Sequence, residues 1–193
     1  MREREHNADA VQIPSAPWAE VLPGLFIGGS LMNASADLAQ FDLVVSLSRS
    51  GNYGCPVPRE VAEVHMFFGD GTTVPPDARI EPVLEIVTEC LARNERVLIR
   101  CQAGLNRSGL MTALTMVALG WDPEEAVAHL REVRSPDVLF NPMFLARVLG
   151  EDFECVACET GSHRCTAPLL PGSALACGTE IVHGLQTCRR HAP

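Results

Sequence analysis

The sequence predicts an α/β domain, because two stretches each have the pattern of a buried strand followed by a loop and a helix. Residues 96–99 have the pattern of a short buried strand, and residues 107–119 form an apolar-rich stretch long enough for a helix. Residues 64–68 are strand-like, and the apolar side chains from Ile80 to Leu91 recur at helical spacing. Strands that alternate with helices along the chain are typical of this fold class.

The composition fits one domain of ordinary size with a small appendage. The chain has 193 residues, of which 47% are hydrophobic, and this is enough apolar material for a core. All 15 basic residues are arginine, which indicates GC-rich codons and hence a bacterial source. The formal charge of -9 argues against a nucleic-acid surface, which normally carries a basic stripe. No run of 18 apolar residues exists to cross a membrane, and the polar start is not a secretory signal, so we expect a cytoplasmic protein.

The first part of the chain contains an arm and the start of one helix. Residues 1–16 are polar or contain proline, and they predict a flexible N-terminal arm. After two prolines at positions 75 and 76, Asp77 and Glu81 favour the start of the helix that includes residues 80–91. Cys90 lies on the apolar face of this helix and is therefore predicted to be a core cysteine.

Two further helices are predicted towards the end of the domain. Residues 122–125 combine a cap, a proline in the first turn and two acids, and His129 is expected on the surface of the helix that follows. Asn141 and the proline after it begin a last helix, which Gly150 ends. We therefore expect the domain to span residues 17–150.

Residues 100–109 place a thiol, a run of backbone amides and an arginine around one phosphate-sized space at a strand-to-helix turn. Gly104 can adopt backbone angles that other residues avoid, so that successive N–H groups turn inward and form an anion cradle at a helix N-terminus. The positive end of that helix stabilises the thiolate of Cys101, which we place at the entrance of the loop. Arg107 offers a planar fork of donors for two phosphate oxygens, and Ser108 can donate a hydrogen bond to the sulfur. The alternative is a buried structural cysteine followed by an ordinary helix.

Cleavage of a phosphate ester by a thiolate needs an acid for the leaving oxygen and then a base for the incoming water, and one carboxyl group can do both. Asp70 is our candidate, since it lies between two glycines after the strand-like residues 64–68. A mobile loop that carries an acid is expected at such a position. The alternative is an aspartate that only forms a turn with Gly71.

The chain resembles the compact dual-specificity type of the cysteine-dependent protein tyrosine phosphatase superfamily over residues 17–150. Four features in family order carry the resemblance: residues 18–29, the strand-like residues 41–48, the Asp70 loop, and the loop from Cys101 to Gly109. The resemblance implies a twisted, mostly parallel sheet flanked by helices. It also implies catalysis without a cofactor and proteins phosphorylated on Tyr, Ser or Thr as substrates.

The resemblance assigns a role to each of four side chains. Cys101 is implied as the nucleophile, Arg107 as the phosphate clamp, Asp70 as acid and base, and Ser108 as a group that assists dephosphorylation. The residues that are expected to bind phosphate are Gln102, Ala103, Gly104, Leu105, Asn106 and Arg107.

Two residues depart from the family pattern. Arg100 stands directly before Cys101, where the family usually has a histidine that helps to hold the thiolate, and its side chain either takes over that role or points outward. Asn106 stands where dual-specificity members more often carry a small hydroxyl residue, and the Asn-Arg-Ser-Gly ending resembles the branch that removes phosphate from RNA 5′ ends. Arg134 either approaches the phosphate, as basic residues in this region do in relatives, or is a solvated surface charge.

These departures leave three alternatives to a protein phosphatase open. They are an RNA 5′-polyphosphate phosphatase, an inositol-phosphate phosphatase, and an inactive adaptor that binds phosphate without turnover.

Residues 151–193 contain five of the eight cysteines and show little helical or strand periodicity. In a reducing compartment, this density favours a structural Zn²⁺ bound by thiolates and imidazole over disulfides. The preferred ligand set is Cys165, Cys177, Cys188 and His191. A competing set joins Cys155 and Cys158 with Cys188 and His191, and a flexible tail without metal is the third possibility. We expect the zinc module to recruit a protein partner or to cover the active-site face.

Overall fold

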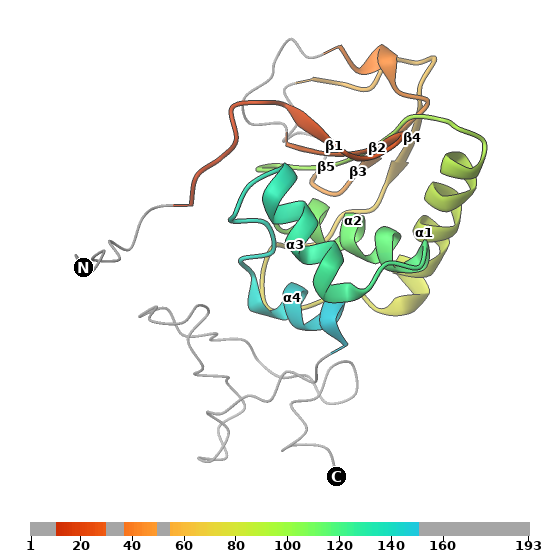
Figure 1. Cartoon of the computed structure of the whole chain (residues 1–193). Helices are drawn as coiled ribbons and strands as arrows, with labels where there is room; N and C mark the ends of the chain where they lie inside the picture. Colours follow the sequence, from red (N-terminus) through yellow and green to blue (C-terminus); the bar gives the residue numbers. More distant parts are fainter. Residues whose placement is uncertain (1–10, 30–36, 50–54, 151–193) are drawn as a thin grey trace, which may run out of the picture.

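The computed structural model describes residues 11–29, 37–49 and 55–150. Within these ranges, a five-stranded sheet has the strand order β1-β2-β5-β3-β4 (Figure 1). Its strands are β1 (Trp18–Leu22), β2 (Leu25–Gly29), β3 (Leu43–Ser46), β4 (Ala62–His65) and β5 (Val97–Cys101). β1 pairs with β2 antiparallel, and every other pairing is parallel. The mostly parallel sheet that the resemblance implied is thereby confirmed.

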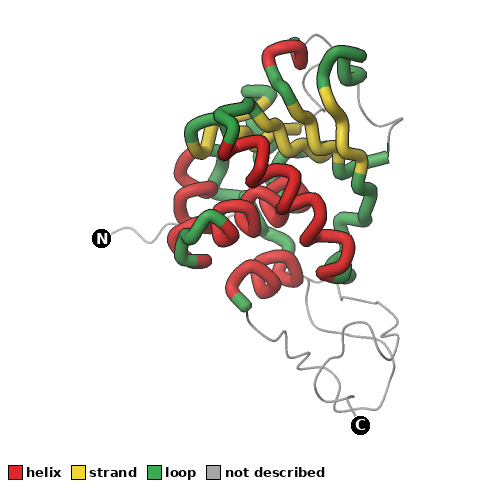
Figure 2. Tube along the Cα trace, turned by 90° about the vertical axis from the view of Figure 1, so that its right-hand side faces the viewer, coloured by secondary structure: helices red, strands yellow, loops and turns green. Residues whose placement is uncertain are grey.

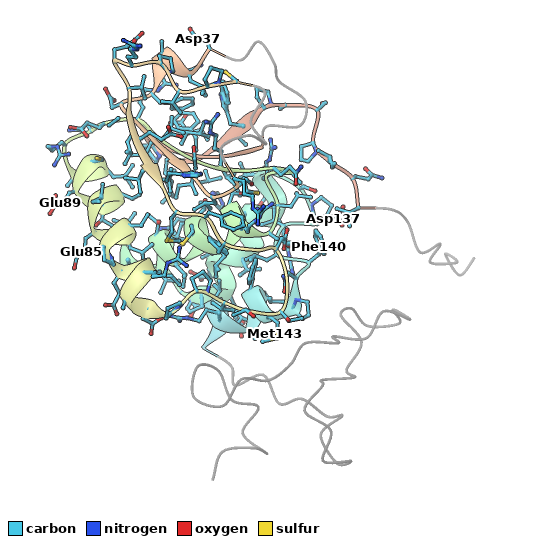
Figure 3. The ribbon with its side chains drawn as sticks, turned by 180° about the vertical axis from the view of Figure 1, so that it is seen from behind. Asp37, Glu85, Glu89, Asp137, Phe140 and Met143 are labelled. Atoms are coloured by element: carbon cyan, nitrogen blue, oxygen red, sulfur yellow. The ribbon has the colours of Figure 1, made fainter. Side chains whose placement is uncertain are left out.

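The α-helices of the described residues cover one face of this sheet (Figures 1 and 2). They are α1 (Asp77–Ala92), α2 (Arg107–Ala118), α3 (Pro123–Val133) and α4 (Pro142–Leu149). A short 3-10 helix, η1 (Leu38–Gln40), lies on the opposite side of the sheet (Figure 2). On the outer side of α1, the acidic residues Glu85 and Glu89 point away from the core (Figure 3).

Both faces of the sheet are covered by apolar side chains, so β5 is buried along its whole length. Val97, Ile99 and Cys101 belong to the large core cluster on the side of the helices. Leu98 belongs to a smaller cluster on the other face. Because successive side chains of a strand point to opposite faces, Arg100 and Cys101 point in opposite directions.

The central helix of the helical layer is α2. Its residues from Arg107 to Met116 are all buried, because it packs against the sheet, α1, α3 and α4. A helix that is covered on all sides has no freedom to shift as a unit. This packing fixes the helix N-terminus, and with it the loop of residues 102–106, at the carboxyl end of β5.

The helix boundaries follow the capping signals of the sequence. Asp122 caps α3 by accepting hydrogen bonds from the N–H groups of Glu124 and Glu125, at 2.9 Å and 3.2 Å. Asn141 caps α4, and Gly150 ends it in the left-handed region with a φ of 67°. These predicted helix ends are confirmed, because capping depends on residues that are close in sequence.

Two strands are shorter than the sequence predicts, because β3 covers only Leu43–Ser46 of the strand-like residues 41–48 and β4 also ends early. β4 ends at His65, whereas the strand-like pattern continues to Phe68. Beyond His65 the chain is tied to β3 and the residue after it by isolated bonds, from Met66 N–H to Ser46 O at 3.0 Å and from Phe68 N–H to Leu47 O at 3.5 Å. The side chains of Met66 and Phe68 are buried from a loop, so their apolar character reflects burial and not strand pairing.

Two side chains that the sequence analysis placed away from the chemistry have structural roles. Cys90 is buried as predicted, and this burial, followed by the influence of Glu95, raises the pKa of its thiol to about 11. His129 is not a simple surface residue. Its Nε2 lies 2.7 Å from the carbonyl oxygen of Val21, and its ring lies 5.2 Å from that of Trp121, so it connects α3 to β1.

Part of the predicted N-terminal arm contacts the domain. The N–H of Gln12 donates to Asp137 Oδ2 at 2.9 Å, and the carbonyl oxygen of Ala16 accepts from Arg134 Nη1 at 2.7 Å. These two bonds tie residues 12 and 16 to the end of α3 and the segment after it.

Among the helices that the structure describes, none has the length and apolar character needed to span a membrane.

Candidate active site

The loop of residues 102–106, which we call the phosphate loop after the role predicted for it, surrounds the sulfur of Cys101. Gly104 has a φ of 76°, as the sequence predicts, and its N–H donates to Cys101 Sγ at 3.2 Å. The Ser108 hydroxyl lies 3.2 Å from the same sulfur, with either atom able to donate. The Cys101 side chain is only 1% exposed, so the sulfur lies inside the loop and not at its entrance, where the sequence analysis placed it. The cause is the alternation along β5, which directs this side chain towards the helical layer.

The backbone of the loop packs directly on the end of β2. A Cβ atom on Gly104 would lie 2.7 Å from both the carbonyl carbon of Gly28 and the nitrogen of Gly29. A Cβ atom on Gly29 would lie 2.7 Å from the carbonyl group of Ala103. Side chains at these positions would therefore push the two backbones apart, and this explains the glycines at both places.

Arg107, the first residue of α2, is 7% exposed and is oriented towards the Asp70 loop. Its Nη1 donates to the carbonyl oxygen of Phe68 at 3.5 Å. Its Nε is buried without a hydrogen-bond partner among the described residues and lies 4.0 Å from Asp70 Oδ2. An unpaired buried N–H of a guanidinium is costly unless a ligand accepts from it, and a phosphate oxygen is a suitable acceptor.

Two asparagine side chains hold the carboxyl group of Asp70. The Asp70 side chain is 33% exposed. Asn106 Nδ2 donates to Asp70 Oδ2 at 3.3 Å, and Asn141 Nδ2 donates to Asp70 Oδ1 at 3.2 Å. The structure thus brings Asp70 next to the phosphate loop, as the sequence analysis expected. Asn141 was assigned only the capping role, and no local signal in the sequence connects it with Asp70.

Arg134 approaches the phosphate loop from the carboxyl end of α3. Its Nε donates to the carbonyl oxygen of Gly104 at 3.4 Å, and it is 8% exposed. Burial lowers the pKa of its guanidinium to about 10, and the charge of Cys101 acts in the opposite direction. Of the two alternatives that the sequence left open for Arg134, the structure shows the approach to the site.

Arg100 does not take the place of a histidine beside the thiol. Its Nε donates to Ser46 Oγ at 3.0 Å and its Nη1 to the carbonyl oxygen of Cys55 at 2.8 Å, while Nη2 lies 3.7 Å from Glu63 Oε1. The side chain is 4% exposed, so it does not point into solvent either. The alternation of β5 directs it to the face opposite Cys101, where it joins β5 to β3 and β4.

Of the other predicted site residues, some lie in the loop and the rest lie outside the residues that the structure describes. Gln102, Ala103 and Leu105 lie in the loop, and because the Leu105 side chain is fully buried in the core, this residue can offer only its backbone. The predicted zinc ligands, which lie outside the described residues, are Cys165, Cys177, Cys188 and His191, with Cys155 and Cys158 as the alternatives. Within residues 11–29, 37–49 and 55–150, no group of three or more His, Cys, Asp or Glu side chains could hold a metal ion.

Comparison with known proteins finds a matching family model and similar curated proteins. The family model described as "Dual specificity phosphatase, catalytic domain" matches residues 28–151. Over 75 residues the chain is 36% identical to "Probable protein tyrosine phosphatase type IVA A" of Dictyostelium discoideum, a match that covers 37% of this chain and 45% of that protein.

Two further matches are a viral protein and a solved structure. Over 80 residues the chain is 34% identical to "Dual specificity protein phosphatase H1" of Variola virus, a match that covers 42% of this chain and 46% of that protein. The chain therefore spans less than half the length of these two relatives. The crystal structure of human DUSP28 superposes with a TM-score of 0.61 and 25% identity, covering 73% of this chain and 95% of that one.

Proposed function

We infer that this chain, which belongs to the family of dual specificity phosphatase catalytic domains, hydrolyses phosphate monoesters on proteins through a phosphocysteine intermediate. The proposal rests on the groups that surround the sulfur of Cys101. Cys101 Sγ receives a backbone N–H and lies within hydrogen-bond distance of a serine hydroxyl. Arg107 stands at the end of the same loop with a buried Nε that has no hydrogen-bond partner among the described residues. Such an arrangement offers hydrogen-bond donors both to the sulfur and to an anionic ligand.

In the first step, the thiolate of Cys101 attacks phosphorus and the bond from phosphorus to the leaving oxygen breaks. The Asp70 carboxyl group gives its proton to that oxygen, so the product leaves as a neutral hydroxyl compound. Arg107 and the amides of residues 102–107 hold the other phosphate oxygens as negative charge develops on them. The incoming phosphate must enter the loop, since the sulfur is buried inside it.

In the second step, a water molecule attacks the phosphorus of the phosphocysteine. The Asp70 carboxylate takes a proton from this water, the bond from phosphorus to sulfur breaks, and inorganic phosphate and the thiolate result. Ser108 assists because its hydroxyl, 3.2 Å from the sulfur, can donate to the thiolate as it leaves. No cofactor takes part in either step as we propose it.

Turnover of phenyl phosphate by the wild type and by Asp70→Ala tests the proposal. Phenolate is a poor leaving group, so we expect Asp70→Ala to lower kcat by about 10²-fold to 10⁴-fold, the usual contribution of a general acid. On a dinitrophenyl phosphate, whose leaving group needs no proton, the variant should keep most of its kcat/KM, because kcat/KM reports the first step and not the later role of Asp70 as a base. Phosphate binding without turnover in the wild type would instead support the inactive adaptor.

The substrate class needs a separate comparison. We propose phosphorylated proteins, because the family of the chain and the activities named for its relatives are of this kind. A panel of phosphotyrosine, phosphoserine and phosphothreonine peptides, a phosphoinositide and a triphosphorylated RNA distinguishes this from the two other enzyme classes. Preference for the RNA or the phosphoinositide by kcat/KM would overturn the protein substrate and leave the chemistry intact.

The zinc module and the division into an arm, a domain and a tail remain predictions from the sequence. We propose that Cys165, Cys177, Cys188 and His191 bind one structural Zn²⁺ in the segment 151–193, which also recruits a partner. The expectations of a bacterial source and a cytoplasmic location rest on the composition alone.

Metal analysis of the purified full-length chain tests the zinc module. We expect about one Zn²⁺ per chain, because a four-ligand site closes around a single ion. A chelator should then make the tail sensitive to protease while turnover of an aryl phosphate stays unchanged. Cys165→Ser should abolish zinc binding and Cys155→Ser should not, whereas the reverse result would favour the competing ligand set. A chain that contains no zinc would contradict the module.

A further inference from the structure

We propose that Asn106 and Asn141 are positioning residues that together hold the Asp70 carboxyl group against the phosphate loop for proton transfer. The inference deepens the proposed function and rests on it. It starts from the two hydrogen bonds that Asp70 receives, one on each carboxylate oxygen. The two asparagines come from different elements, since Asn106 lies in the phosphate loop and Asn141 begins α4.

The orientation of both amide groups is fixed by backbone N–H groups. Asn106 Oδ1 accepts from the N–H of Asn141 at 3.0 Å, and Asn141 Oδ1 accepts from the N–H of Met143, in the first turn of α4 (Figure 3), at 3.0 Å. A backbone N–H can only donate, so the oxygen of each amide must face it. The nitrogen of each amide is therefore the atom that faces Asp70, and a flipped amide would lose both bonds.

The burial and the hydrogen bonding of Asn106 indicate that its side chain serves Asp70 and not its own helix. It stands at the N-cap of α2, where an asparagine usually caps the helix, but its side chain makes no capping bond. The residue is 2% exposed, and its amide bonds instead to Asn141 and Asp70. Asn141 is 8% exposed and also donates to the carbonyl oxygen of Gly71 at 2.8 Å, so it fixes the backbone after Asp70 as well.

Arg107 cannot provide the same restraint during the reaction. Its Nε lies 4.0 Å from Asp70 Oδ2, and a bound phosphate would take its donors. The two amides would then remain as the groups that hold the carboxyl. The acid thus keeps its place relative to the loop that binds the phosphate, in both of its protonation states.

Two serine variants separate this role from a structural one. Asn141→Ser keeps an oxygen that can cap α4 but is too short to reach Asp70, and Asn106→Ser introduces a small hydroxyl residue into the loop. We expect each variant to lower kcat/KM for phenyl phosphate by about 10-fold to 100-fold, the scale on which a misplaced catalytic group loses rate. For the dinitrophenyl ester, whose leaving group does not need the acid, kcat/KM of Asn141→Ser should change by less than about threefold, whereas Asn106→Ser, which alters the phosphate loop itself, should lose clearly less on this ester than on phenyl phosphate.

A double-mutant cycle with Asp70→Ala completes the experiment. If the asparagines act through Asp70, adding either serine substitution to Asp70→Ala should cost less than about threefold more on phenyl phosphate. Asp122→Ser, which keeps a capping oxygen on α3 in the same way, is the matched control and should leave both substrates unchanged. Thermal unfolding of each variant shows whether it is folded, and the two asparagine variants report independently.

The outcomes distinguish this inference from the function on which it rests. Equal losses on the two esters, or a full additional loss in the Asp70→Ala background, would overturn the positioning role alone. A wild-type chain that hydrolyses neither ester would overturn the proposed function and this inference with it. A loss confined to the phenyl ester, and absent without Asp70, would support both.

Discussion

Cys101→Ser is expected to lower kcat for an aryl phosphate by about 10⁴-fold or more, because a serine hydroxyl in this loop has no general base to activate it. In the proposed mechanism the sulfur attacks as a thiolate, and the Gly104 N–H and the Ser108 hydroxyl are in position to donate hydrogen bonds to it. The variant should still bind phosphate, because the loop amides and Arg107 are unchanged. Steady-state kinetics and titration with inorganic phosphate measure the two properties separately.

Cys55→Ser is the matched control for this prediction. Cys55 is half-buried, and its thiol lies 3.9 Å from the carbonyl oxygen of Pro56. The same change of sulfur to oxygen there should leave turnover within about twofold, as expected for substitutions away from a site. If Cys101→Ser retained turnover close to that of the wild type, the thiolate mechanism would have to be abandoned.

Arg107→Lys should lower kcat by about 10²-fold to 10³-fold, the loss seen when one donor to a developing charge is removed. Lysine keeps the positive charge but lacks the planar fork that can hold two phosphate oxygens at once. The buried position of Arg107 leaves little space for a lysine to reach the same oxygens by another route. Steady-state kinetics on phenyl phosphate and on the dinitrophenyl ester should show a similar loss for both, because the phosphate and not the leaving group is affected.

Arg96→Lys provides the control for charge and size. Arg96 lies before β5, at the end of the sheet opposite the phosphate loop, where its Nη2 donates to Gln40 Oε1 at 3.0 Å. We expect its replacement to leave kcat within about twofold. A wild-type rate in Arg107→Lys would show that the fork of donors is not needed, and that the loop amides alone hold the phosphate.

The parts of the site that the sequence predicted are those that local chemistry controls. The thiol, the loop glycine, the clamp and the serine fall within residues 101–108, so one strand-to-helix turn places all of them. The same holds for the helix ends at Asp122 and Gly150. Asp70 was predicted from its position after a strand, and it lies beside the loop because the carboxyl ends of β4 and β5 share one edge of the sheet.

The contacts that the sequence did not predict join residues far apart in the chain. Asn141 binds Asp70 across 71 positions, and Arg134 binds Gly104 across 30 positions. No periodicity or spacing connects such pairs, because the packing of α3 and α4 on α2 decides which side chains meet. The direction of Arg100 was open for a similar reason, since it depends on which face of β5 the helices cover.

The amino-acid sequence by itself determined which groups are available: a cysteine, a loop of amides and an arginine suited to a phosphate ester, and an aspartate in the loop that follows a strand of the same sheet. Only the tertiary structure decided how these groups are held, with the sulfur inside the loop, Arg100 on the far face of the sheet and two asparagines on the acid. The reason is physical. Bonding within a few residues is set by local backbone geometry, whereas the meeting of distant side chains is set by how the buried faces of helices and strands pack.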